Sequence, residues 1–119
     1  MKIRELKELL SAELMTDDAA LLDGEVFNAC CSDMMSDVLA FVKDQGVLLT
    51  GLVNEQVIRT ASMMDMVCIV FVRDKTPTPD MIRLAEDCDI VVMKSAYRAY
   101  EACGKLYISG LVARREPHN

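Results

Sequence analysis

The chain has 119 residues, the size of one ordinary domain, and we expect a single domain over residues 1–119. Apolar residues make up 52% and charged residues 27%, which excludes a disordered chain, and no apolar run reaches the ~20 residues that a membrane-spanning helix needs. The net charge of −6 argues against nucleic acid as a partner, because phosphate binding needs clustered Lys and Arg.

The cellular location is predicted from the N-terminus and the cysteines. The first ten residues, MKIRELKELL, mix charged and apolar residues, whereas a signal peptide needs an uninterrupted apolar core. The five cysteines are odd in number, which is typical of reduced thiols in a cytosol rather than of a disulfide framework. We therefore expect a cytoplasmic protein without membrane association.

The first part of the chain predicts a helix and two short strands. Apolar residues recur at helical spacing from Ile3 to Leu10, so the helix should end near Ser11. Residues 13–16 and 25–31 are strand candidates. Ser32 or Asp33 then caps a second predicted helix, whose buried side is expected to carry Met34, Val38, Phe41 and Val42.

The rest of the chain alternates between strands and helices. After a tight turn at Gly46, buried strands are expected at residues 47–49, 66–72 and 90–93. The helices between and after them should be capped by Asn54, by Thr78 with Pro79 at the first helical position, and by Ser95. The expected apolar residues of these helices are Val57, Ile58, Ala61 and Met64; Ile82, Leu84 and Ala85; and Tyr100, Cys103, Leu106 and Tyr107.

This alternation predicts an α/β fold, a single domain with a mostly parallel small sheet flanked by helices. Its residues offer little for catalysis. The one histidine, His118, lies in a polar tail, and the five glycines are too scattered for a dinucleotide or triphosphate loop. We expect no catalytic residues, no metal site and no cofactor, and therefore no enzyme.

Three features leave alternatives open. Cys30 and Cys31 precede a predicted helix N-terminus, which would lower a thiol pKa, and an enzyme using one of them is the weakest hypothesis. Asp33 and Asp37 could approach each other as a ligand pair, although helix capping is the simpler interpretation. The doublets at residues 34–35 and 63–64 place one methionine each off the buried stripe, which leaves apolar surface for an oligomer contact.

The predicted ligand site lies at the carboxyl ends of the strands, where loops meet helix N-termini that favour anions. Ordinary capped loops are the alternative, because every α/β protein has such an end. The residues proposed to bind a small anionic ligand or nucleotide there are Thr50, Gly51, Asn54, Arg73, Lys75, Thr76, Lys94 and Ser95.

Three segments together resemble a known family. They are SDMMSDVLAFVKDQGVLLTGLVNEQVIRTASMMDMVCIVFV from Ser32, a Pro-capped helix, and SAYRAYEACGKLYISG from Ser95. Nearly the whole chain is similar to the DRTGG domain, especially to stand-alone bacterial forms that look like the N-terminal domain of HPr kinase/phosphorylase. The most specific matches are Ser32, Asp33, Ser36, Asp37, Val38 and Ala40, with Gly104 in the last helix. Where related chains carry glycines after the second buried strand, this chain has VRDKTPTPD.

The resemblance implies a module without its own catalytic centre, often dimeric, which occurs fused to phosphate acetyltransferases and to nucleotide-regulated pyrophosphatases. The P-loop domain that does the catalysis of HPr kinase/phosphorylase is not in this sequence, so a kinase activity is not implied. Our first hypothesis is a non-enzymatic regulatory or assembly module that acts as a homodimer, with an unknown protein partner. The alternative is a small-ligand sensor that binds a nucleotide or other anion at the strand ends.

Overall fold

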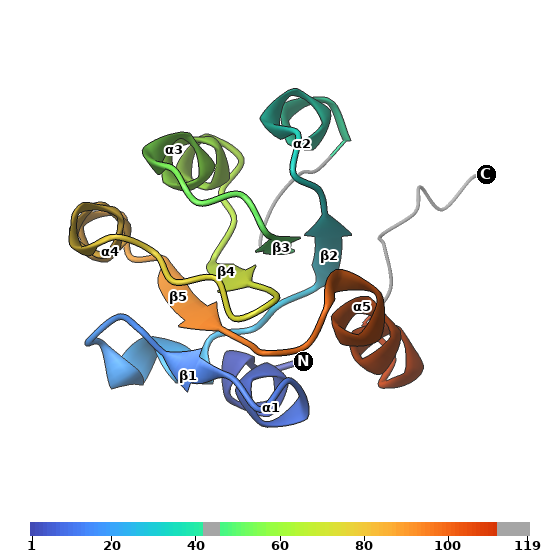
Figure 1. The fold of residues 1–119 in the computed structure, drawn as a ribbon. Helices are drawn as coiled ribbons and strands as arrows, with labels where there is room; N and C mark the ends of the chain where they lie inside the picture. The colour runs from blue at the N-terminus through green and yellow to red at the C-terminus, as the bar shows by residue number, and fades with distance from the viewer. Residues whose placement is uncertain (42–45, 112–119) are drawn as a thin grey trace.

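The computed structural model describes residues 1–41 and 46–111, without the side chain of residue 41. Five strands, five α-helices and one 3₁₀ helix make up this part of the chain (Figure 1). In chain order they are α1 (Ile3–Leu9), β1 (Glu13–Leu14), η1 (Ala19–Asp23), β2 (Asn28–Cys31), α2 (Met35–Phe41), β3 (Gly46–Thr50), α3 (Glu55–Met63), β4 (Cys68–Phe71), α4 (Pro79–Asp87), β5 (Val91–Lys94) and α5 (Ala99–Ile108).

The strands form one sheet in the order β1-β5-β4-β3-β2. β2, β3, β4 and β5 are parallel to their neighbours, and only β1 runs antiparallel, with Glu13 opposite Lys94. The prediction of an α/β fold with a mostly parallel sheet is therefore confirmed. The sheet is mixed because the segment after α1 adds a short antiparallel strand to the β5 edge.

Helices cover both faces of the sheet. In Figure 1, α2, α3 and α4 lie over one face, and α1 and α5 lie over the other. Successive strand residues alternate between the two layers: Leu48 and Phe71 belong to the core under α2, α3 and α4, whereas Leu49 and Val70 belong to the core on the opposite face. Strands buried on both faces need apolar residues at every position, which explains the continuous apolar runs in the sequence.

Two predicted helix caps are confirmed. The Asn54 side chain accepts a hydrogen bond from the Val57 N–H at 3.2 Å, and the Thr78 hydroxyl accepts one from the Met81 N–H at the same distance. Pro79 occupies the first helical position of α4, where its missing N–H costs nothing. These caps act within one turn, which is why local sequence predicts them.

The prediction for the buried side of α2 was right for Val38 and wrong for Met34. Met34 is 60% exposed, whereas Met35 and Val38 face the core. The helix begins at Met35, so the Ser32 hydroxyl accepts from the Met34 N–H ahead of it and Asp33 turns toward β3. Val42 and the side chain of residue 41 lie outside what the structure describes.

Two further predictions for the last helix were wrong. Ser95 is buried and donates its hydroxyl hydrogen to the Leu10 carbonyl at 2.8 Å, while α5 begins later, with Arg98 at the N-cap. Of the expected apolar residues, Leu106 is buried as predicted, whereas Tyr100 and Tyr107 are exposed, and Ala102 is the second buried residue of the helix. The apolar residues of α5 surround most of its circumference, so the sequence did not specify which side faces the sheet.

The methionine doublets leave apolar surface, as predicted. Met34 and Met63 are 60% and 66% exposed, while Met35 is buried and Met64 is half-buried.

Gly46 is the first residue of β3, and it lies opposite Asn28 of β2. Among the described residues, no helix is both long and apolar enough to cross a bilayer.

Candidate functional site

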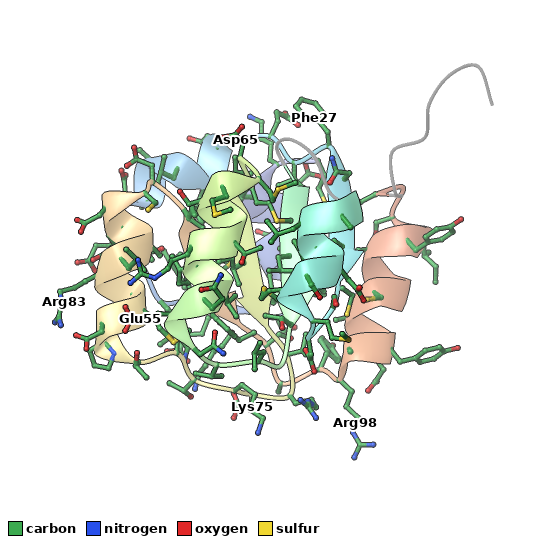
Figure 2. The ribbon with its side chains drawn as sticks, turned by 90° about the horizontal axis from the view of Figure 1, so that it is seen from above. Phe27, Glu55, Asp65, Lys75, Arg83 and Arg98 are labelled. Carbon is green, nitrogen blue, oxygen red and sulfur yellow. The ribbon has the colours of Figure 1, made fainter. Side chains whose placement is uncertain are left out.

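The candidate site lies at the carboxyl end of the parallel strands. β2, β3, β4 and β5 end at Cys31, Thr50, Phe71 and Lys94, so the loops that follow them meet at one edge of the sheet. Figure 2 shows Lys75 and Arg98 at this end of the molecule, with Phe27 and Asp65 at the other end. The sequence predicted this convergence because parallel strands end on the same side.

Asp33 joins the first two of these loops. One of its carboxylate oxygens accepts hydrogen bonds from the Gly51 N–H at 2.8 Å and from the Thr50 hydroxyl at 2.9 Å. The hydrogen bond from Gly51 is the main cause that holds the pKa of the Asp33 carboxyl below its ordinary value. The Thr50 hydroxyl and the nearby Arg73 guanidinium lower this pKa further, whereas partial burial of the carboxyl raises it. Asp33 is therefore an ionised group that fixes the end of β3.

The third loop brings a guanidinium against the second. A Cβ added to Gly51 would overlap the Arg73 side chain, so the absence of a side chain at Gly51 lets the guanidinium lie directly over the backbone. Arg73 also lies close enough to Asp33 to lower the pKa of that carboxyl. The positive charge of Arg73 is thus partly compensated by Asp33 before any ligand binds.

The backbone of the third loop is held in an unusual conformation. Arg73 and Asp74 have φ angles of 58° and 57°, in the left-handed region that non-glycine residues rarely adopt. Their N–H groups donate to the carbonyls of Tyr97 and Ser95, each at 2.8 Å. These bonds tie the β4–α4 loop to the segment after β5, which positions the two loops relative to each other.

Lys94 is the second compensated cation of the site. Its ammonium group donates to the Thr76 hydroxyl at 3.2 Å and lies 3.6 Å from the Asp74 carboxylate. The Lys94 side chain is only 20% exposed, whereas that of Asp74 is 67% exposed. An anion that reached Lys94 would therefore have to compete with Asp74.

Two cations at this end have no such partner. Within the described residues, the side chains of Lys75 and Arg98 are exposed and make no hydrogen bond or ion pair. They come from the β4–α4 loop and from the N-cap of α5. Four cations therefore lie at the strand ends, and the uncompensated positive charge comes from Lys75 and Arg98.

The structure divides the predicted site residues into two groups. Gly51, Arg73, Lys75, Thr76 and Lys94 lie in the strand-end loops with backbone or side chains at the surface or half-buried. Thr50, Asn54 and Ser95 are used for structure: Thr50 is buried against Asp33, Asn54 caps α3, and Ser95 bonds to Leu10.

Three residues of this end were missed by sequence reasoning. Asp33 had been interpreted as a helix cap, although a carboxylate directly after an edge strand is also placed to reach the next strand end. Asp74 and Arg98 lie next to or near predicted site residues in the sequence, and their charges could have marked them as members of the site. The sequence does not show that Asp74 pairs with Lys94 while Arg98 has no ion pair, because this depends on the geometry of the loops.

The prediction of a lowered pKa for Cys30 and Cys31 was wrong. Burial is the first cause that raises the pKa of the Cys30 thiol, and a hydrogen bond with Cys103 is the first cause that raises that of Cys31. The thiol with the lowered pKa is instead Cys103, on α5. Among the described residues, no group of three or more Cys, His, Asp or Glu side chains is arranged to hold a metal ion.

Comparison with known proteins gives a structural match alone. No protein-family model and no curated protein matches the sequence. One matching solved structure is that of the CBS and DRTGG domains of the regulatory region of Clostridium perfringens pyrophosphatase, complexed with its activator, diadenosine tetraphosphate. The two share 15% sequence identity at a TM-score of 0.72, over 88% of this chain and 45% of that chain. This chain thus has the fold of part of that region and spans less than half its length.

Proposed function

We propose that this chain is a cytoplasmic DRTGG-type regulatory or assembly module that acts as a homodimer and has no catalytic centre of its own. The observation that supports a regulatory role is the fold it shares with the regulatory region of the clostridial pyrophosphatase. The strand-end site agrees with this role, since its polar groups hold loops together.

The support for a homodimer comes from the β2 edge of the sheet. Among the described residues, β2 pairs only with β3, and its outer side has no strand partner. Exposed apolar side chains lie at both ends of β2 and on α2 and α5, which flank it in Figure 1. We call this surface the apolar edge; it comprises Phe27, Met34, Leu39 and Tyr107. A second copy would cover it and the open strand.

The dimer is tested by replacing one methionine of the apolar edge with a charge. We expect the wild-type chain to scatter light as twice its mass of 13.3 kDa, and Met34→Glu to scatter as the monomer, because a buried unpaired carboxylate disfavours the contact. Met63→Glu is the matched control, since Met63 is equally exposed but lies on α3. A monomeric wild type, or the same dissociation in both variants, would contradict the proposal.

A second candidate function is the sensing of an anionic ligand, such as a nucleotide, at the strand ends. The specific observation is the uncompensated charge of Lys75 and Arg98 beside the N-termini of α4 and α5. A chain with a net charge of −6 does not attract anions in general. A group of unpaired cations at one end of such a chain therefore favours an anion-binding site at that end. The neighbour's activator, diadenosine tetraphosphate, is a suitable probe together with ATP and inorganic pyrophosphate.

Thermal unfolding measures this binding directly. A ligand at one hundred times its Kd is expected to add about 2.7 kcal/mol to the free energy of unfolding, which raises Tm by several degrees. The double variant Lys75→Ala with Arg98→Ala should lose most of that gain, whereas Arg59→Ala, an exposed arginine paired with Glu55 on α3, should retain it. If none of the three anions raises Tm, or if Arg59→Ala loses the gain equally, the sensor hypothesis is wrong.

A further inference from the structure

A cavity of about 160 Å³ lies between the edge strand β2 and helix α5. Its walls include the apolar side chains of Leu49, Leu106 and Tyr107. Three cysteines are also among its lining residues, Cys30 and Cys31 of β2 and Cys103 in the middle of α5. An apolar hollow that gathers thiols from two separate elements is not required by the proposed regulatory function.

Two of these thiols form a pair. Cys31 and Cys103 line the same cavity, and a hydrogen bond between their thiols shifts the pKa of both, although they lie on a strand and a helix that are distant in sequence. Cys31 is exposed and Cys103 is half-buried, so a small molecule can reach the pair from solvent. Cys30 lies on the other side of β2, where it packs against the core under α2, α3 and α4.

The environments of the two thiols assign them different roles. The hydrogen bond from Cys31 lowers the pKa of the Cys103 thiol, which favours a thiolate at Cys103. The pKa of Cys31 is raised, first by its hydrogen bond with Cys103, then by burial, with a further contribution from the nearby Asp33 carboxylate. Cys103 is therefore the nucleophile, and Cys31 keeps its proton.

We propose that Cys31 and Cys103 are a redox-active thiol pair that reduces small, uncharged disulfides and closes to an intramolecular disulfide linking β2 to α5. The hydrogen bond places the two sulfurs within reach of each other, and the apolar cavity accommodates the substituent of the incoming disulfide. The Asp33 carboxylate near Cys31 disfavours an anionic substituent.

The reaction balances in two exchange steps. The Cys103 thiolate attacks one sulfur of the disulfide R–S–S–R, the S–S bond breaks, and one thiolate RS⁻ leaves. The departing thiolate takes the proton of Cys31, whose sulfur then attacks the Cys103 sulfur of the mixed disulfide and expels the second RS⁻. Starting from the Cys103 thiolate and the Cys31 thiol, the protein loses two electrons and one proton, and the small disulfide is reduced to two thiols once the last thiolate takes a proton from water.

The experiment incubates the full chain with bis(2-hydroxyethyl) disulfide and follows its intact mass, free thiols and peptide map. The wild type should lose two of its five thiols, with a mass lower by two hydrogens and a peptide link between Cys31 and Cys103. Cys31→Ser should stop at one mercaptoethanol adduct on Cys103, because the resolving thiol is gone. Cys30→Ser is the matched control and should form the same link as the wild type.

Three outcomes would overturn the inference. They are adducts spread over all five cysteines without the Cys31–Cys103 link, a disulfide between two chains on a non-reducing gel, and an unchanged extent of intramolecular oxidation in Cys103→Ser. Each variant's circular dichroism spectrum and Tm, measured in reducing buffer, show whether it is folded. Because Tyr107 lines the cavity and also belongs to the apolar edge, the Met34→Glu variant is treated in the same way as the wild type. Formation of the Cys31–Cys103 link in either chain supports the inference whatever the oligomeric state, so its failure is distinguishable from failure of the proposed function.

Discussion

Replacement of Phe71 by alanine is expected to lower the free energy of unfolding by about 3–5 kcal/mol. Phe71 is fully buried at the end of the central strand β4, and its ring belongs to the core under α2, α3 and α4. Truncation removes the apolar contacts of the ring and leaves a cavity, because the surrounding strands and helices relax only partly. Urea unfolding followed by circular dichroism measures this loss. The urea concentration at the midpoint should fall, while the dependence of the unfolding free energy on urea concentration should stay unchanged.

Tyr100→Ala is the control for the loss of an aromatic ring. Tyr100 is 91% exposed on α5, so its removal should change the free energy of unfolding by less than about 0.5 kcal/mol. The free energy of unfolding of a domain of this size is typically about 5–15 kcal/mol, so Phe71→Ala should remove a large part of it. Equal effects of the two substitutions would show that Phe71 does not occupy the core position described.

Gly46→Ala is expected to destabilise the protein by about 1–3 kcal/mol. Gly46 opens β3 directly opposite Asn28, and an added Cβ would overlap the buried Asn28 side chain. That amide would have to move, which disturbs its polar contacts and the first pair of the β2–β3 ladder. Thermal or urea unfolding of the variant measures the cost.

Gly104→Ala is the matched control, with the opposite expected sign. Gly104 lies inside α5, and a Cβ there would meet no atom within 4 Å. Alanine restricts the unfolded chain and favours the helix, so the variant should gain about 0.4–1 kcal/mol. If Gly46→Ala were as stable as the wild type, the close packing of β2 against β3 at this point would be disproved.

The caps of α3 and α4 and the buried strands were predictable, whereas the cap of α5 and the full buried sides of α2 and α5 were not. Asn54 and Thr78 bond to N–H groups three residues further along, so a window of a few residues contains both partners. The buried strands needed only their continuous apolar runs. Val38 and Leu106 were correctly expected on the buried sides of α2 and α5, but Met34 and Tyr107 were not excluded. Apolar residues occur around both helices, and only packing against the sheet decides which of them are buried.

The candidate site was predictable in place and less so in detail. Parallel strands bring their carboxyl ends together, so Gly51, Arg73 and Lys94 were correctly placed at one edge. The pairing of Asp33 with Gly51, and of Lys94 with Asp74, depends on loops held by contacts between distant segments. Ser95 lies at the predicted end but faces Leu10, because the antiparallel addition of β1 brings the first helix beneath it.

The sequence by itself determined the α/β alternation and the parallel core of the sheet, because periodicity and capping are local properties of the chain. Tertiary structure alone decided which cations are compensated, which apolar residues remain on the β2 edge, and that the Cys103 thiol meets Cys31. These depend on side-chain contacts between segments distant in sequence, which form only when the helices pack on both faces of the sheet.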